Sequence, residues 1–270
     1  MTTVSQRKIV GIIPAAGNAT RMAPLPCSKE LYPIGFRNTD DGRSVRPKPV
    51  GQYLLEHFHR AGAKRVYIVI RKGKWDIPEY FGDGEALGLA IGYLIMNLPH
   101  GVPYTIDQAN AFVRDATVVF GFPDILIEPE DAFPRIVAHL EATNADVVLG
   151  LFPTDQPHLC DPIAFDEQGH IREIFVKPVH SDLRVTWAIA AWAPSFTQFL
   201  HKHLAELERA AETATAPRPE FQISHVIMAA IKSGLRVEGL HLPGAHFIDI
   251  GVPENLVLTL RMQLAALQAP

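Results

Sequence analysis

The fold of this chain is decided by one stretch near its beginning, residues 11–34, which is GIIPAAGNATRMAPLPCSKELYPI. Its first letters complete an apolar run over residues 8–14 that is typical of a buried β-strand. A loop of small residues follows, and it carries two cations, Arg21 and Lys29. Ligands of open α/β sheets bind beyond the carboxyl ends of the strands, where such loops lie. The stretch therefore predicts a strand of a parallel sheet and a ligand-binding loop directly after it.

The rest of the chain alternates strand patterns with helical patterns. Strands are predicted at residues 65–70, 116–120, 146–151, 186–193 and 237–242, and helices at residues 52–61, 132–143, 195–214, 224–233 and from 253 onward. A β-hairpin is predicted where residues 163–166 and 171–176 flank a short turn. Ser195 is expected to cap the long helix that follows it. This alternation predicts an α/β fold of the Rossmann-like kind, with a mostly parallel central sheet flanked by helices.

The composition is that of an ordinary globular protein, with 47% hydrophobic and 20% charged residues among 270. Apolar runs end well short of the roughly 20 residues that a membrane span needs. Residues 1–8 lack the apolar region of a signal peptide, so we expect a soluble, cytoplasmic protein without membrane contact. A formal net charge of −4 without a basic tract argues against nucleic acid as a partner. Two cysteines make neither a disulfide framework nor a zinc site.

The loop after the first strand has the residue types of a phosphate site. Small side chains at residues 15–17 and at Ala19 let backbone N–H groups approach phosphate oxygens closely. Arg21 can bind phosphate through two hydrogen bonds, and Lys29 can act as a mobile point charge. The letters match neither a Walker A loop nor a GxGxxG fingerprint. The alternative is a small-residue turn that only packs a helix on the sheet.

These letters resemble the signature of the sugar-nucleotide pyrophosphorylases, the nucleotidyltransferase family of glucose-1-phosphate thymidylyltransferases and UTP–glucose-1-phosphate uridylyltransferases. The matching letters are Gly17, Thr20, Arg21, Met22, Pro24, Leu25 and Lys29. Ala19 stands where the family usually has glycine, and Ser28 stands where it usually has proline. Alanine keeps the loop small, whereas Ser28 is expected to relax the backbone before Lys29. The resemblance continues through residues 46–70 and 80–93 and covers nearly the whole chain.

The resemblance implies the nucleotide-diphospho-sugar transferase fold, which is GT-A-like. No repeat or low-complexity linker divides the chain, so we expect one domain over residues 1–270. Residues 1–150 would form its nucleotide-binding half and residues 151–270 its sugar-phosphate-binding half. Members of the family are often dimers or tetramers, so a homo-oligomer is compatible with the resemblance.

Two aspartates are the metal ligands that the resemblance implies. The segment VVFGFPDIL, residues 118–126, places Asp124 two positions later than the family's Gly-Asp carboxylate. The segment HFIDIGVPENL, residues 246–256, matches the second aspartate motif at Asp249. An aspartate between two isoleucines needs a partner, and a bound cation would supply one. The alternatives are a turn-capping role for Asp124 and a structural ion pair for Asp249.

Three further residues are assigned to the acceptor half. The segment FVKP, residues 175–178, resembles the family's Glu-Lys-Pro, with Val176 in place of glutamate and Lys177 retained. This resemblance implies that Lys177 holds the sugar phosphate. Glu220 follows from a similar but looser match. Trp187 and Trp192 lie five residues apart on one predicted strand, which puts them on opposite faces, and Trp187 is our candidate for the wall of the sugar pocket.

The base and sugar of the nucleotide would be approached by the segment YTIDQANAF, residues 104–112. The resemblance suggests Gln108 and Asp107 as contacts there. A plain helix start with Thr105 as its N-cap explains the same letters. The nucleotide-binding residues that we predict are Ala15, Ala16, Gly17, Asn18, Ala19, Thr20 and Gln108.

The implied activity joins a nucleoside triphosphate, with dTTP or UTP favoured, to a sugar 1-phosphate, with glucose 1-phosphate favoured. Pyrophosphate leaves, Mg²⁺ is the cofactor, and Arg21 and Lys29 are the catalytic cations. One alternative is a non-catalytic nucleotide-sugar sensor on the same fold, suggested by the departures from the motifs. Another is the same chemistry with a non-sugar phosphate acceptor such as phosphocholine. The letters do not specify the nucleobase or the sugar.

Overall fold

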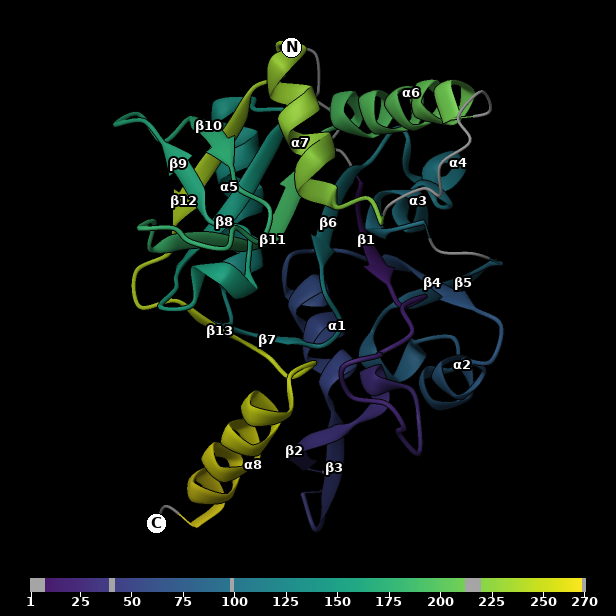
Figure 1. The fold of residues 1–270 in the computed structure, drawn as a ribbon. Coiled ribbons are helices and arrows are strands. Elements are labelled where there is room, and N and C mark those ends of the chain that lie inside the picture. Colours follow the sequence, from purple (N-terminus) through teal and green to yellow (C-terminus); the bar gives the residue numbers. More distant parts are fainter. Residues whose placement is uncertain (1–7, 39–41, 98–99, 212–219, 269–270) are drawn as a thin grey trace, which may run out of the picture.

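The computed structural model describes residues 8–38, 42–97, 100–211 and 220–268. Residues 1–7, where we expect no signal peptide, and the end of the helix predicted at residues 195–214 lie outside these ranges. The described strands form a central seven-stranded sheet (Figure 1). Its spatial order is β12 (Val237–His241), β8 (Val147–Pro153), β11 (Val185–Trp192), β6 (Thr117–Gly121), β1 (Ile9–Pro14), β4 (Arg65–Arg71) and β5 (Ala90–Met96).

The sheet is mostly parallel, as predicted. β1 pairs in parallel with β4 and β6, and β12 pairs in parallel with β8. Among the described strands of this sheet, β11 alone runs antiparallel to its neighbours. Strands that are covered on both faces have continuous apolar runs, and Val118, Val119 and Phe120 of β6 are all fully buried.

Helices cover both faces of the sheet. Side chains alternate along β1, so that Val10 and Ile12 belong to one core cluster while Ile13 belongs to the other. The cluster around Ile13 is covered by α1 (Val50–Arg60) and α5 (Ala132–Thr143). The other cluster is covered by α3 (Val102–Asp107), α4 (Asn110–Val113), α6 (Pro194–Ala211) and α7 (Ile223–Lys232). The fold is therefore a three-layer α/β arrangement.

The remaining elements lie at the borders of this core. The predicted hairpin is confirmed as β9 (Ile163–Phe165) paired antiparallel with β10 (Ile171–Ile174). β2 (Pro33–Asn38) pairs with β3 (Val45–Pro49), and β7 (Ile125–Glu128) pairs with β13 (His246–Asp249). α2 (Asp76–Phe81) follows β4. In Figure 1, α8 (Pro253–Gln268) extends away from the sheet beside β2 and β3.

The predicted cap of the long helix is wrong. α6 begins at Pro194, whose fixed backbone angle suits a first helical position. Ser195 lies inside the helix, and its hydroxyl group donates to the carboxylate of Asp146 instead of capping the backbone. The Ser195 hydroxyl group thus connects α6 to the residue that precedes β8.

The prediction for the two tryptophans is also wrong. Trp187 pairs with Leu151 while Ile189 pairs with Gly150, so the register shifts by one residue between them. Such a bulge reverses the alternation of side chains along the strand. Both tryptophan rings therefore pack on the same side of the sheet, in one core cluster with Phe120.

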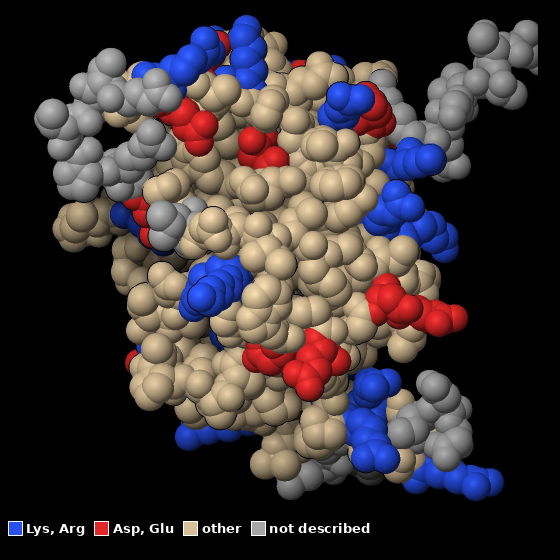
Figure 2. All heavy atoms as spheres, turned by 90° about the vertical axis from the view of Figure 1, so that its right-hand side faces the viewer, with Lys and Arg blue, Asp and Glu red and all other residues tan. Residues whose placement is uncertain are grey.

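The described surface carries charges of both signs. Figure 2 shows the side of β5 and α2, where small groups of basic and acidic residues surround a broad uncharged area. Among the described residues, no helix combines the length and the apolar character needed to cross a membrane.

Candidate active site

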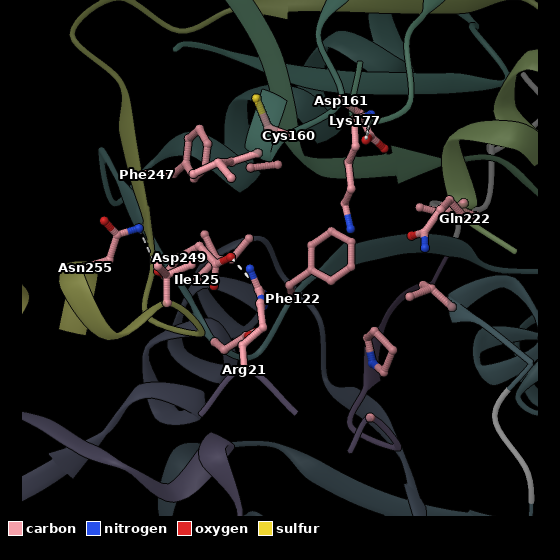
Figure 3. Close-up of a pocket in the computed structure, with 18 of the residues that line it drawn as sticks. Arg21, Phe122, Ile125, Cys160, Asp161, Lys177, Gln222, Phe247, Asp249 and Asn255 are labelled. Carbon is pink, nitrogen blue, oxygen red and sulfur yellow. Dashed lines mark hydrogen bonds and ion pairs between the residues drawn. The ribbon is translucent and has the colours of Figure 1, made fainter. Parts of the chain in front are cut away.

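A cavity of about 870 Å³ lies at the carboxyl edge of the sheet. It is lined by the loops after β1, β6 and β8, by β13, and by the beginnings of α7 and α8. Figure 3 shows Lys177 reaching into the cavity from one wall and Arg21 from the opposite wall, with Phe122 between them. Ligands of open α/β sheets bind at this edge. The predicted residues that line the cavity are Ala16, Gly17, Asn18, Thr20, Arg21, Lys29, Asp124, Lys177, Trp187, Glu220 and Asp249.

The loop after β1 is fixed at both ends by backbone hydrogen bonds. Ala15 N–H donates to the carbonyl of Val69 at 2.8 Å, and the N–H groups of Met22 and Ala23 both donate to the carbonyl of Ala19 at 2.9 Å. Ala19 has φ of 53°, in the left-handed region that favours glycine. The glycine usual at this position would thus avoid strain that Ala19 bears. The turn after Ala19 is nevertheless formed, as expected from the small side chain of alanine.

Lys29 lines the cavity and forms an ion pair with a neighbouring acid. Its Nζ lies 2.6 Å from Oδ2 of Asp124, and its side chain is one-fifth exposed. Burial alone would lower the pKa of Lys29, but the carboxylates of Asp124, Glu30 and Asp249 together raise this pKa above its ordinary value. Lys29 is therefore a fully charged ammonium at neutral pH.

The two residues beside Lys29 are held by a single neighbouring segment. Ser28 donates to the carboxylate of Asp76 twice, from its backbone N–H at 2.6 Å and from its hydroxyl group at 2.7 Å. The buried carboxylate of Glu30 accepts two bonds from the buried ammonium of Lys74, at 2.7 and 2.9 Å. Burial lowers the pKa of Lys74 despite this partner. The expectation that Ser28 relaxes the backbone is wrong, because Asp76 uses the N–H that a proline would lack.

Asp124 and Asp249 come from distant parts of the sequence but lie on paired strands. β13 pairs with β7 so that Asp249 is opposite Ile125. In addition, Ile250 N–H donates to the carbonyl of Asp124 at 2.9 Å. Asp124 stands two residues later than the family's carboxylate, but it still lies beside Asp249. The reason is that β13 pairs with β7, which begins directly after Asp124.

The two carboxylates converge beside Gly251, where a side chain would have no room. A methyl group added there would lie 2.8 Å from Oδ1 of Asp249, 2.9 Å from Oδ2 of Asp124 and 3.1 Å from the guanidinium of Arg21. Arg21 donates to the other oxygen of Asp249 at 3.3 Å. Gly251 N–H donates to Oδ1 of Asp249 at 2.8 Å, which fixes that carboxylate. Both acids and one cation thus surround the position that a side chain of residue 251 would take, so only glycine fits there.

The electrostatics at this point favour a cation. Burial and the nearby carboxylate of Asp124 raise the pKa of Asp249, and Arg21 opposes this effect only in part. Two neighbouring carboxylates are suitable ligands for Mg²⁺, which takes its other ligands from water and phosphate. Among the described residues, no cluster of three or more histidine, cysteine or acidic residues could hold a metal ion. Within the described part of the chain, Asp124 and Asp249 together offer two carboxylate groups, which is a donor set that fits the ion.

Lys177 lies on the acceptor side of the cavity with an unusual backbone. Its φ of 42° is left-handed, and its N–H donates to Asp161 at 3.2 Å. Among the described residues, none pairs with its ammonium group, which extends into the cavity (Figure 3). Trp187 lines the same side and donates from its indole N–H to Ser224 at 3.2 Å. Glu220 also lines the cavity and is exposed.

The predicted nucleotide-binding set is only partly brought together. Gln108 does not line the cavity, and its amide donates to the carbonyl of Tyr104 at 3.3 Å. Asp107 pairs with His201 at 3.0 Å. The alternative with Thr105 as N-cap is also wrong, because α3 already begins at Val102. Two other predicted residues, Ala15 and Ala19, do not line the cavity either.

Several cavity residues were missed from the sequence. Asp161, Phe122 and Gln222 line the cavity. Asn255 lines it as well, and its amide donates to the carbonyl of Asp249 at 2.9 Å. Asn255 could have been found, since it directly follows the Pro-Glu of the second aspartate motif. Asp161 belongs to no motif that we identified, so its place depends on the tertiary fold.

Comparison with known proteins identifies the family of this chain. The family described as "Nucleotidyl transferase" matches residues 10–258. A low-salt glycan biosynthesis nucleotidyltransferase of Haloferax volcanii is 22% identical over 92% of this chain and 64% of its own length. A glucose-1-phosphate thymidylyltransferase of Streptomyces antibioticus is 25% identical over 86% of this chain and 60% of its own. This chain thus spans less than two thirds of either relative.

A solved structure of UDP-glucose pyrophosphorylase, complexed with UDP-glucose, has the same fold. Its TM-score is 0.74 at 17% identity, covering 97% of this chain and all of the other. Because the family match extends over nearly the entire chain, the protein belongs to the nucleotidyl transferase family.

Proposed function

We propose that this protein condenses a nucleoside triphosphate with a sugar 1-phosphate to give a nucleotide sugar and pyrophosphate. The observation that carries the proposal is the convergence of five charged residues from separate segments on one cavity. These residues are Arg21, Lys29, Asp124, Lys177 and Asp249. Two anionic substrates must be brought together, so a cavity with cations on opposite walls supplies what the reaction needs.

Each cation has a distinct role in this reaction. Backbone N–H groups of the loop after β1 and the guanidinium of Arg21 hold the β- and γ-phosphates. Lys29 stabilises the charge that develops at the α-phosphate, and Lys177 holds the incoming sugar phosphate. An oxygen of that phosphate attacks the α-phosphorus, a new P–O bond forms, and the bond to the β-phosphate breaks as pyrophosphate leaves. No general base is needed because the attacking oxygen is already ionised.

Asp124 and Asp249 would hold the Mg²⁺ ion. When bound, the ion supplies charge neutralisation between the phosphates of the two substrates. The two cations of this site exchange their carboxylate partners for phosphate oxygens. Lys29 leaves the carboxylate of Asp124 for a phosphate oxygen, and Arg21 leaves Asp249 in the same way, which frees both acids.

The choice of substrates is supported by relatives. A similar protein is named as a glucose-1-phosphate thymidylyltransferase, and another as a UTP–glucose-1-phosphate uridylyltransferase. The solved structure with the same fold holds UDP-glucose. We therefore favour dTTP or UTP as donor and glucose 1-phosphate as acceptor.

The test is release of pyrophosphate from a panel of substrates. ATP, CTP, GTP, UTP and dTTP are each combined with glucose 1-phosphate, mannose 1-phosphate, N-acetylglucosamine 1-phosphate or phosphocholine, with and without Mg²⁺. We expect Mg²⁺-dependent release with dTTP or UTP and glucose 1-phosphate. If phosphocholine is the only acceptor that is turned over, the acceptor is not a sugar phosphate. Nucleotide-sugar binding without any release would contradict the enzyme and favour a sensor.

A further inference from the structure

Asp161 is the hub of a polar network below the acceptor side of the cavity. Its Oδ1 accepts the N–H of Lys177 at 3.2 Å, and its Oδ2 accepts the hydroxyl group of Ser224. Its backbone carbonyl accepts the hydroxyl group of Thr186 at 2.8 Å. Ser224 in turn accepts the indole N–H of Trp187 at 3.2 Å. One aspartate thus connects the loop after β8, the Lys177 loop, α7 and β11.

Most of this network is shielded from water. Ser224 and Thr186 are fully buried, and Trp187 is 6% exposed. Hydrogen bonds away from water are electrostatically stronger and hold their partners in one arrangement. Asp161 itself lies at the border, between this buried network and the cavity (Figure 3).

The conformation of Lys177 needs such a support. Residues other than glycine rarely adopt a left-handed backbone, and a non-glycine residue held there indicates a constraint from its surroundings. Within the described part of the chain, Asp161 is the side chain that accepts the N–H of Lys177. Figure 3 shows that in this conformation the lysine side chain extends toward Phe122 and the centre of the cavity.

Asp161 is poorly suited to bind the acceptor phosphate itself. A carboxylate facing a phosphate repels it, and both oxygens of Asp161 already accept hydrogen bonds from the protein. Its carboxylate can nevertheless serve the acceptor phosphate through Lys177, whose N–H it accepts. The geometry therefore favours an indirect role.

We propose that Asp161 is a positioning residue that fixes Lys177 for the phosphate of the acceptor. This inference rests on the proposed function of Lys177. It predicts that loss of Asp161 impairs the use of the acceptor but not of the triphosphate, because the loop after β1 shares none of the described bonds of Asp161.

The test compares Asp161→Ala, Asp161→Asn and Ser224→Ala with wild type. Misplacement of a substrate by about 1 Å can lower the rate of an enzyme about 100-fold. We therefore expect Asp161→Ala to raise the KM for glucose 1-phosphate by at least about 10-fold. The KM for the triphosphate should stay within about twofold of wild type. Asp161→Asn keeps an acceptor for the N–H of Lys177 and should restore most of the affinity. Ser224→Ala removes one anchor of the carboxylate and should give an intermediate KM.

The matched control is Asp166→Asn. Asp166 accepts N–H groups of Gln168 and His170 in the turn between β9 and β10, at 3.0 and 2.9 Å, and does not line the cavity. Its loss should leave both KM values unchanged. Equal rises in both KM values for Asp161→Ala, or no rise in either, would overturn the inference.

A crystal structure of Asp161→Ala tests the inference without any turnover. Lys177 is expected to leave its left-handed backbone, and retention of the wild-type Lys177 conformation would contradict the positioning role. If Asp161→Ala does not fold, the structure of Ser224→Ala serves the same purpose. If wild type releases no pyrophosphate from any substrate pair, the proposed function fails, but this structural readout still decides the role of Asp161.

Discussion

The ammonium of Lys29 lies 2.6 Å from the carboxylate of Asp124, so a cation proposed to bind phosphate is paired with an acid proposed to bind metal. Arg21 and Asp249 repeat the relationship at 3.3 Å. The pKa of Lys29 is raised in the fold, so its stabilising contribution is fully present below about pH 10.5 and is lost only as pH rises through the raised pKa. At neutral pH, the metal and the triphosphate must therefore displace intact ion pairs.

This relationship predicts an opposite effect of one substitution on two ligands. Lys29→Met removes the competitor of the metal, so we expect Mg²⁺ to bind the nucleotide-free protein about 10-fold more tightly, a change of roughly 1.4 kcal/mol. The same variant should bind dTTP or UTP more weakly, because it has lost a phosphate contact. Titration calorimetry measures both affinities.

The control for this experiment is Lys48→Met. Lys48 pairs with Glu56 at 2.6 Å and does not line the cavity. Neither affinity should change in this variant. An unchanged or weaker affinity for Mg²⁺ in Lys29→Met would show that Lys29 does not compete for the metal site.

Asp249→Asn should abolish most of the activity. The substitution keeps the size of the side chain but removes one of the two charges that would hold Mg²⁺. We expect a loss of at least about 100-fold in rate, the scale of one strong electrostatic contact. Pyrophosphate release at limiting Mg²⁺ is the measurement, and a rate near that of wild type would exclude Asp249 from the metal site.

Gly251→Ala should impair the site by crowding the carboxylates of Asp124 and Asp249. The new methyl group would lie 2.8 and 2.9 Å from the carboxylate oxygens of Asp249 and Asp124, which must then move apart. We expect weaker binding of Mn²⁺, measured by electron paramagnetic resonance.

The control variant is Gly92→Ala, which introduces a similar steric clash outside the cavity. Its methyl group would lie 2.9 Å from the ring of Tyr67 on the edge of the sheet. Stability should fall in this control while the affinity for Mn²⁺ is kept. Equal Mn²⁺ affinities in the two variants would mean that the space beside Gly251 is not part of the metal site.

Glu30→Gln should destabilise the protein strongly. It leaves the ammonium of Lys74 buried without its charged partner, which typically costs about 3–5 kcal/mol. The double variant Glu30→Leu with Lys74→Met should recover much of this loss, since an apolar pair avoids the buried charge. Chemical denaturation followed by circular dichroism measures the free energy of unfolding. If Glu30→Gln is as stable as wild type, this ion pair does not hold the segment of Lys29.

Ala19→Gly should stabilise the protein although it removes a methyl group. The left-handed backbone costs alanine about 1–2 kcal/mol, whereas glycine loses roughly 0.5–1 kcal/mol through its freer unfolded chain. We expect a net gain of a few tenths of a kcal/mol to about 1 kcal/mol. Ala16→Gly, at a buried site without positive φ, should instead lose stability. A lower melting temperature for Ala19→Gly would contradict strain at Ala19.

Local patterns were sufficient to predict much of the fold and of the site. The helix predicted at residues 132–143 is α5, and the strand predicted at residues 65–70 is β4, extended by one residue. Apolar periodicity identifies such elements because packing on one face determines them. Arg21, Lys29, Asp124, Lys177 and Asp249 were predicted from short motifs, and all five line the cavity.

What could not be predicted depends on contacts between distant segments. The bulge in β11 that turns Trp187 to the side of Trp192 exists in the pairing with β8, not in the letters of β11. Asp76 holds Ser28 across 48 positions of sequence. Asp161 gains its role only when Lys177 and Ser224 come beside it. Gln108 does not line the cavity, because a sequence match does not specify which side of a short helix faces it.

The central claim is tested most directly by a crystal structure with dTTP and Mn²⁺ but without a sugar phosphate. Anomalous scattering locates the metal. The account predicts one peak between the carboxylates of Asp124 and Asp249, with the ammonium of Lys29 moved from Asp124 to a phosphate oxygen. A metal bound elsewhere, or Lys29 still paired with Asp124 beside a bound triphosphate, would contradict it.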